Sequence, residues 1–200
     1  MDAFTVLRIG NEALALLGAQ AVAQPDEGTD IAATLFRIAP TTLAQALTAH
    51  PWQCTLAQPR LTRLAVPPGH GFRHAYALPA GMLALRRVVA TPHPGAPAIG
   101  RWRMVGNELH ADAEEVHADV QREPPLEHWP PHLRVFARAA LAADLALNVT
   151  GSGNDAQFWA QRAWGNGDQS LLMQARRVEA QQQTPAPMED WPLLAARFGG

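Results

Sequence analysis

The stretch LRVFARAALAADLAL, residues 133–147, decides the fold that the sequence predicts. One apolar stripe recurs along it at helical spacing: Leu133, Ala137, Leu141 and Leu145. A second set widens this stripe to about half of the helix circumference: Phe136, Ala140, Ala143 and Leu147. Such a helix must be covered by other helices, so we expect it at the centre of the molecule. Trp129-Pro130-Pro131 opens it, because proline is tolerated in the first turn of a helix.

Two further helices are expected before this stretch. Ala3–Leu17 and Ile31–His50 both carry apolar residues at helical spacing. The second of these helices has Thr29 or Asp30 as its N-terminal cap. Pro40 should kink it, because proline lacks a backbone donor and crowds the preceding turn.

A fourth helix is expected from about Asp155 to Ala180. Gly165 and Gly167 each weaken this helix by roughly 1 kcal/mol relative to alanine. Three interpretations stay open at these glycines: a kink, a break, or close packing against another helix.

The middle of the chain, from about Thr62 to Arg122, is rich in proline and alternates between apolar and polar residues. Short runs bounded by turn residues are typical of antiparallel strands. Gly106-Asn107 predicts a hairpin, because both residues tolerate positive φ angles. Another turn is expected at Pro79-Ala80-Gly81. Together these runs predict a small antiparallel sheet or a barrel-like insert.

The predicted fold is therefore α+β and mainly α: a bundle of about four helices with a small antiparallel β insert and an extended C-terminal tail. The expected division along the chain is 1–60 for the first two helices, 61–127 for the β-rich insert, 128–183 for the last two helices and 184–200 for a docking tail.

Composition limits the function classes. The chain has 200 residues, of which 48% are hydrophobic, so it can bury a core as one domain. A net charge of −2 gives no global positive field of the kind that non-specific nucleic-acid binding uses. The single Cys54 excludes an intrachain disulfide and a cysteine-based zinc site. No signal-peptide pattern is visible, and the longest apolar run, Ala139–Leu147, is too short to cross a bilayer. We expect a soluble protein that is made in the cytoplasm and has no membrane partner.

Metal binding is one chemistry to weigh. His110, Asp112 and Glu114 alternate and could share one strand face, and His117 with Asp119 forms a second pair. Their spacing fits no standard metal signature. A solvated strand face is therefore favoured over a metal site.

Catalysis is not favoured either. Two pairs of carboxylates could support glycoside hydrolysis, Glu114 with Glu115 and Glu123 with Glu127, but sequence shows neither their separation nor a raised pKa. Neither Ser152 nor Ser170 lies in a nucleophile elbow, and Gly151-x-Gly153 follows a helix rather than a strand. We predict that the chain is not an enzyme and needs no cofactor or metal.

Four arginines of the strand-rich region could contact phosphate: Arg86, Arg87, Arg101 and Arg103. An exposed sheet face or subunit ion pairs are the favoured interpretation of these residues, and contact with DNA is the alternative.

The C-terminal tail has a stronger signal. A linker composition, Gln181-Gln182-Gln183-Thr184-Pro185-Ala186-Pro187, precedes a hydrophobic segment. The residues of that segment expected to dock are Trp191, Pro192, Leu193, Leu194 and Phe198. Burying such side chains stabilises by ~1.5–3 kcal/mol each. Docking into another subunit or a partner is favoured, and folding back onto the same domain is the alternative.

Several segments, in one order, carry a resemblance to a known family. They are Leu16-Leu17-Gly18, His50-Pro51-Trp52 followed by Leu56-Ala57, Tyr76-Ala77-Leu78-Pro79 with Met82-Leu83, Val105-Gly106-Asn107-Glu108-Leu109, and Trp129-Pro130-Pro131 leading into Leu141–Ala146. In this order the chain resembles the tail tubular protein A type of head-to-tail connector from short-tailed bacteriophages, and phage head-completion adaptors more broadly. The chain departs from the family pattern at Ala80-Gly81, where an acidic residue is common, and at Gly165-Asn166-Gly167, where a continuous helix is expected.

The resemblance implies a structural virion protein that forms a dodecameric ring. Such a ring binds the portal protein, presents a surface to the next tail or nozzle protein, and passes DNA through its lumen without reading its sequence. Arg86, Arg87, Arg101 and Arg103 are the candidates to face that lumen. Two alternatives stay open: a virion-associated peptidoglycan hydrolase, and a soluble DNA-binding protein.

Overall fold

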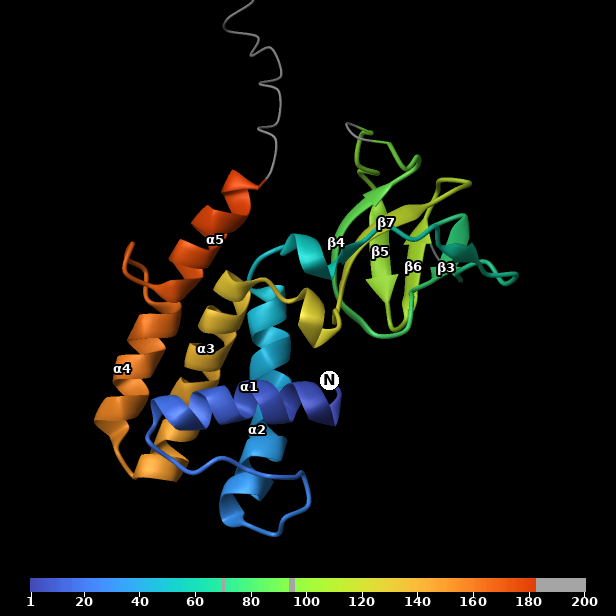
Figure 1. Cartoon of the computed structure of the whole chain (residues 1–200). Helices are drawn as coiled ribbons and strands as arrows, with labels where there is room; N and C mark the ends of the chain where they lie inside the picture. The colour runs from blue at the N-terminus through green and yellow to red at the C-terminus, as the bar shows by residue number, and fades with distance from the viewer. Residues whose placement is uncertain (70, 94–95, 183–200) are drawn as a thin grey trace, which may run out of the picture.

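The computed structural model describes residues 1–69, 71–93 and 96–182. In these ranges the chain forms five α-helices, two short 3-10 helices and seven strands. Figure 1 shows the helices on one side of the molecule and the strands on the other. The prediction of a bundle of about four helices with a small β insert was wrong. The fold is α+β, with five helices and two antiparallel sheets of three and four strands.

Helix α3, Pro131–Thr150, lies at the centre of the helical part, as its wide apolar stripe predicts. It packs against all four other helices: α1 (Ala3–Leu16), α2 (Asp30–Thr48), α4 (Gly153–Trp164) and α5 (Leu171–Gln181). Leu133, Phe136 and Leu141 are completely buried in this core. The last residue of the stripe, Leu147, is 59% exposed, so the other helices leave the end of α3 uncovered.

The helix ends follow local chemistry that the sequence shows. Asp2 caps α1 through a hydrogen bond from the Thr5 backbone N–H to its Oδ1 at 2.7 Å. The Ala32 N–H donates to Thr29 Oγ1 at 3.2 Å, which begins α2. Helix α2 then continues without interruption through Pro40. Gly151, with φ of 68°, ends α3 in the left-handed conformation that glycine adopts without strain.

The predicted fourth helix is two helices, and Gly165 breaks it. A Cβ atom at Gly165 would lie 2.4 Å from the Gln161 carbonyl oxygen, so no other residue fits this backbone. The chain leaves the helix there with ψ of 158°. Ser170 then begins α5 by accepting a hydrogen bond from the Met173 N–H at 3.3 Å. Of the three interpretations of these glycines, the break is correct.

The strands form two sheets that enclose a second core. One sheet has the order β1-β7-β4, with β1 at Leu56–Ala57, β7 at His117–Arg122 and β4 at Met82–Val89. The other has the order β2-β3-β6-β5, with β2 at Thr62–Arg63, β3 at His74–Ala77, β6 at Glu108–Ala111 and β5 at Trp102–Val105. The predicted hairpin at Gly106 joins β5 to β6. The turn at Pro79-Ala80-Gly81 does not form a hairpin, because β3 and β4 belong to different sheets.

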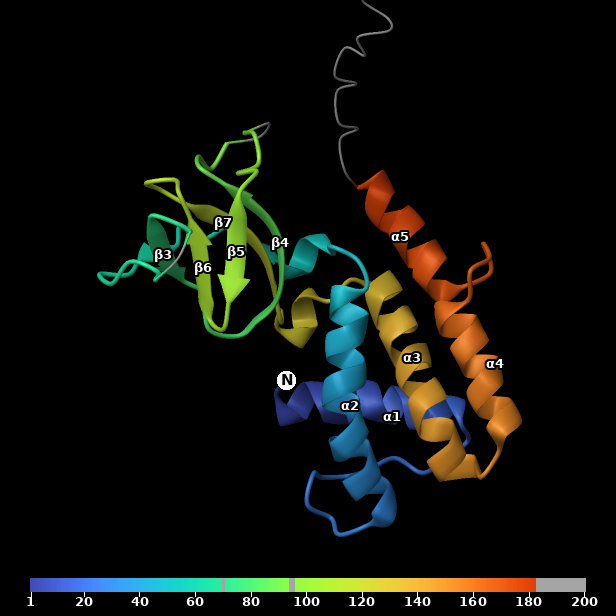
Figure 2. The same cartoon turned by 180° about the vertical axis from the view of Figure 1, so that it is seen from behind.

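Gln121 on β7 joins the strands to the helices. Its side chain is completely buried, and its Nε2 donates to the carbonyl oxygens of Leu47 and His50 at 2.9 and 2.8 Å and to Thr55 Oγ1 at 2.7 Å. Its Oε1 accepts a hydrogen bond from Arg86 Nε at 2.5 Å. Figure 2 shows the C-terminal end of α2 directed toward the strands at this place. A residue of the sheet therefore donates to the Leu47 carbonyl in the last turn of α2, where a helix leaves carbonyl groups without partners, and to the His50 carbonyl beyond it, which also accepts from the Trp52 N–H.

Replacing Gln121 by leucine tests this junction. We expect Gln121→Leu to lower the free energy of unfolding by roughly 2–5 kcal/mol, because it leaves the buried Leu47 carbonyl and the Arg86 Nε–H without the Gln121 amide as partner. Urea unfolding followed by circular dichroism measures the change. Gln58→Leu is the matched control, because Gln58 is exposed, and it should change stability by no more than ~0.5 kcal/mol. Equal stability of the two variants would contradict the assigned role.

Candidate functional site

Large hydrophobic side chains remain exposed on both parts of the molecule. In the described ranges they are Phe4, Leu56, Val66, Trp102, Met104, Val105, Leu147, Phe158 and Val178. Single exposed hydrophobic residues are ordinary, but a cluster at a sheet edge or in a hollow indicates a surface for another molecule. Two places on this chain have that character.

The first place is the edge strand β5. It is the last strand of its sheet, pairs only with β6, and has all four residues exposed. Met104 lies opposite Leu109, and Leu109 lies opposite Tyr76, so the three side chains share one face of the sheet. Leu109 and Tyr76 are buried, whereas Met104 is 51% exposed. The apolar row Tyr76, Leu109, Met104 therefore begins in the core between the two sheets and ends at an open strand edge. Such an edge can pair with another strand.

The second place is a hollow of about 610 Å³ where α4 ends and α5 begins. Phe158 lies in it, 61% exposed, and packs edge-on against Trp159 with ring centroids 5.2 Å apart. Trp159 packs against the helical core, so this neighbour holds Phe158 in place. Arg162 lines the same hollow and donates from Nη1 to the Gln169 carbonyl at 2.7 Å. The hollow is an apolar surface beside one positive charge.

The predicted docking residues of the tail, Trp191, Pro192, Leu193, Leu194 and Phe198, lie outside the described residues. Their docking stays a prediction.

The structure gives three of the four candidate DNA-facing arginines partners within the chain. Arg86 donates to Gln121 and to the Thr48 carbonyl, and Arg87 donates to the Ala96 carbonyl.

Arg101 pairs with Asp112 at 3.1 Å and lies over the Phe72 ring, with its Cζ 4.9 Å from the ring centroid. Arg103 is exposed on β5 and makes no side-chain hydrogen bond within the described ranges. Contact with DNA stays a prediction for all four, and the geometry favours Arg103.

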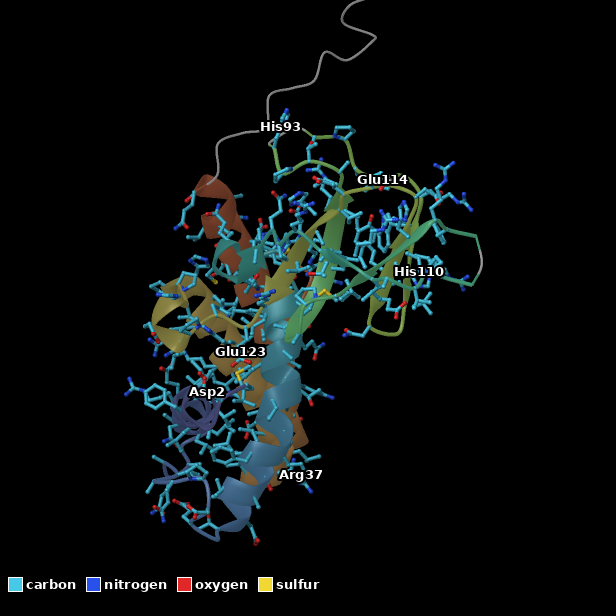
Figure 3. The ribbon with its side chains drawn as sticks, turned by 90° about the vertical axis from the view of Figure 1, so that its right-hand side faces the viewer. Asp2, Arg37, His93, His110, Glu114 and Glu123 are labelled. Carbon is cyan, nitrogen blue, oxygen red and sulfur yellow. The ribbon has the colours of Figure 1, made fainter. Side chains whose placement is uncertain are left out.

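The five residues weighed as metal ligands turn to different partners or are buried apart. His110 Nε2 lies 3.0 Å from Glu108 Oε2, Asp112 accepts from the Arg73 N–H, and Glu114 pairs with Arg63 at 2.8 Å. Of the second pair, Asp119 accepts a hydrogen bond from Gln58 Nε2, and His117 is buried. Figure 3 shows His110 and Glu114 apart on the strand-rich part. Among the residues that the structure places, no group of three or more His, Cys, Asp or Glu could hold a metal ion. His110 is buried on β6, and Asp112 and Glu114 follow the end of that strand, so the three residues do not share one solvated strand face.

Three of the four carboxylates weighed as catalytic pairs, Glu114, Glu115 and Glu123, lie in ion pairs, and no ion pair of Glu127 is present among the described residues. Glu114 and Glu115 line a hollow of about 320 Å³, where Arg63 and Arg60 pair with them at 2.8 and 2.7 Å. Glu123 lies 2.6 Å from the Met1 amino group. Such arrangements are typical of surface ion pairs.

The two serines weighed as nucleophiles, Ser152 and Ser170, both cap helices. Their hydroxyl oxygens accept backbone N–H groups, so a structural role accounts for both.

Glu179 is a polar residue that the sequence analysis missed. It is almost completely buried, and its two carboxylate oxygens accept hydrogen bonds from the Gln53 N–H at 2.5 Å and from His132 Nε2 at 2.7 Å. It therefore attaches α5 to α3 and to the segment after α2. Its position, four residues after the buried Ala175, is the one signal that could have placed it on the inner face of α5.

Comparison with models of known protein families found no match to this chain, and comparison with curated proteins found none either. Within the ranges that the structure covers, no helix is both long and apolar enough to cross a membrane.

Cys54 gives a prediction about reactivity. Burial is the main cause that raises the pKa of the Cys54 thiol to about 11, and the nearby negative charge of Glu179 contributes to the increase. At pH 8 its thiolate fraction is then ~100-fold smaller than that of a cysteine thiol with the ordinary pKa of 9.0. We expect iodoacetamide to alkylate the folded protein ~100-fold more slowly than the urea-unfolded chain, because the thiolate is the nucleophile. Glu179→Gln should speed the folded reaction. Equal rates in the folded and unfolded chains would show that the thiol is not protected.

Proposed function

We propose that this chain is a structural virion protein of a tailed bacteriophage, a subunit of the ring that joins the capsid portal to the tail. The observation that supports assembly most directly is the open edge of β5. There the apolar row that begins in the core between the sheets ends at the exposed side chain of Met104. The resemblance described above supports the particular kind of assembly, a head-to-tail adaptor. The proposed role is structural and needs no cofactor.

A ring requires two different surfaces on each subunit, because each copy contacts one neighbour on either side. The β5 edge lies on the strand-rich part, and the hollow around Phe158 lies between α4 and α5. The two surfaces are separate in sequence and belong to different parts of the fold. This arrangement supports repeated head-to-tail contacts rather than one symmetric dimer contact.

The proposed partners are other copies of the chain in a dodecameric ring, the portal protein, and a downstream tail or nozzle protein. DNA would pass the ring without sequence-specific contacts. Arg103 is the residue whose charge is most available for such non-specific proximity, since Arg86, Arg87 and Arg101 have intrachain partners.

Met104→Lys tests the β5 contact. We expect the wild-type protein to form rings in negative-stain images. In sedimentation velocity, the variant should associate only at a protein concentration at least ~10-fold higher than the wild type. Burying Met104 stabilises each contact by ~1.5–3 kcal/mol, and a buried lysine charge opposes it further.

Val66→Lys is the control for this experiment, because Val66 is exposed but lies outside the strands. Thermal unfolding of both variants should match that of the wild type. If Met104→Lys associates as readily as Val66→Lys, β5 is not part of the contact.

Mass spectrometry of purified virions tests the adaptor role itself. In tailed virions of the virus that carries the gene, we expect a copy number of the chain similar to that of the portal protein. Tailless heads separated on the same gradient are the control and should contain less of it. Absence from virions, with recovery from the soluble fraction of the host cell, would overturn the proposal.

A further inference from the structure

The hollow around Phe158 has features that specify its occupant. Its surface is largely apolar, and its volume of about 610 Å³ is within the range that holds large side chains or drug-sized ligands. Among the residues that line it, Arg162 is the one charged residue, and none is acidic. An occupant should therefore bring bulky apolar side chains preceded or followed by negative charge.

One segment of this chain has that chemistry. Beyond Gln182, the last residue that the structure describes, the sequence continues to Gly200. Glu189-Asp190 directly precede Trp191, and Leu193, Leu194 and Phe198 follow. The acidic pair is complementary to Arg162, and the apolar residues are complementary to Phe158.

The direction of α5 favours the hollow of another copy. The hollow lies at the N-terminal end of α5, and the eleven residues of the helix lead away from it (Figure 1). At 1.5 Å per residue the helix ends roughly 16 Å from where it began. A return to the same hollow would require a reversal within a segment that contains Pro185 and Pro187, a composition that favours extended chain. Trp191 is nine residues beyond Gln182, a reach of up to ~30 Å, which exceeds the length of α5, so the direction of the helix rather than the length of the tail favours a neighbour.

We propose that residues 189–198 of one copy dock in the Phe158 hollow of the next copy, with Trp191 against Phe158 and the acidic pair facing Arg162. The contact is heterologous, so it can repeat around a ring. This inference rests on the proposed ring and names a second contact within it, besides the β5 edge.

Complementation between two defective full-length chains tests the contact. Both chains carry Met104→Lys to weaken the β5 contact. One also carries Phe158→Ser, which damages the hollow and keeps the tail. The other carries Trp191→Ser and Phe198→Ser, which damage the tail and keep the hollow. We expect each chain alone to be monomeric in sedimentation velocity and their mixture to form a 1:1 complex.

The Met104→Lys parent distinguishes docking in another copy from docking in the same copy. If tails exchange between copies, the parent self-associates with increasing concentration, and Phe4→Ser in the same background leaves this unchanged. Phe4 is a matched control, because it is an aromatic residue with the same 61% exposure as Phe158. A monomeric parent whose two defective derivatives nevertheless pair would show docking within one copy and overturn the proposal. A monomeric parent without pairing would show that the tail binds a different protein, which also overturns it.

A charge exchange provides a test that does not depend on the aromatic residues. In the Met104→Lys background, Arg162→Glu should raise the concentration needed for self-association severalfold, and adding Asp190→Arg should restore it. Failure of this rescue would contradict the assigned orientation of the tail. Circular dichroism and thermal unfolding verify that every variant is folded. Virions that contain the chain, together with a monomeric Met104→Lys parent, would refute this inference alone and leave the adaptor role standing.

Discussion

The position of the sheets relative to the helices depends on the Gln121 side chain. The end of an α-helix leaves carbonyl groups without partners, and in α2 one of them, the Leu47 carbonyl, is buried away from water. One carboxamide on β7 supplies the missing donor and accepts a hydrogen bond from Arg86. Because this amide is completely buried, the sheet cannot slide along the end of α2 without breaking several hydrogen bonds at once.

A second buried polar group fixes the other end of the helical part. Helix α5 packs on the helical core through the buried Ala175 and the partly buried Leu171 and Leu172. The carboxylate of Glu179 adds a polar attachment, because it accepts from His132 on α3 and from the Gln53 N–H. A buried charge is tolerated only where it has such partners. The hydrogen bonds of Glu179 therefore help to fix where α5 ends and in which direction it points.

The sequence predicted the local features well and the long-range ones poorly. The apolar stripe of residues 133–147 placed α3 at the centre, Thr29 predicted the start of α2, and Gly106-Asn107 predicted the β5–β6 hairpin. All of these depend on neighbours within a few residues. The separation of β3 and β4 into two sheets, and the pairing of β1 with β7, depend on contacts between distant residues, which no local period reveals.

The same distinction applies to the candidate site. Arg86 and Arg87 resembled phosphate ligands because their charge is visible in the sequence and their partners are not. Their acceptors, which include Thr48 and Ala96 carbonyls, are backbone atoms and leave no trace in residue type. Glu179 was missed for the converse reason, since its buried partners include a backbone N–H.

The contrast between interior and surface is the strongest argument for a subunit that neighbours complete. Inside, the buried Gln121 and Glu179 side chains are hydrogen-bonded, and among the residues that the structure describes His117 Nδ1 is the one buried side-chain atom without a partner. On the surface, the apolar row of the strand-rich core ends at the exposed Met104 on the open edge of β5. The Phe158 ring lies exposed in the hollow between α4 and α5. Arg103 lies in the middle of that edge strand, where a charge discourages indiscriminate pairing of strands. An apolar edge that carries such a charge suits a partner surface that is apolar and can pair with the arginine, and in the ring that we propose copies of the same chain would be that partner.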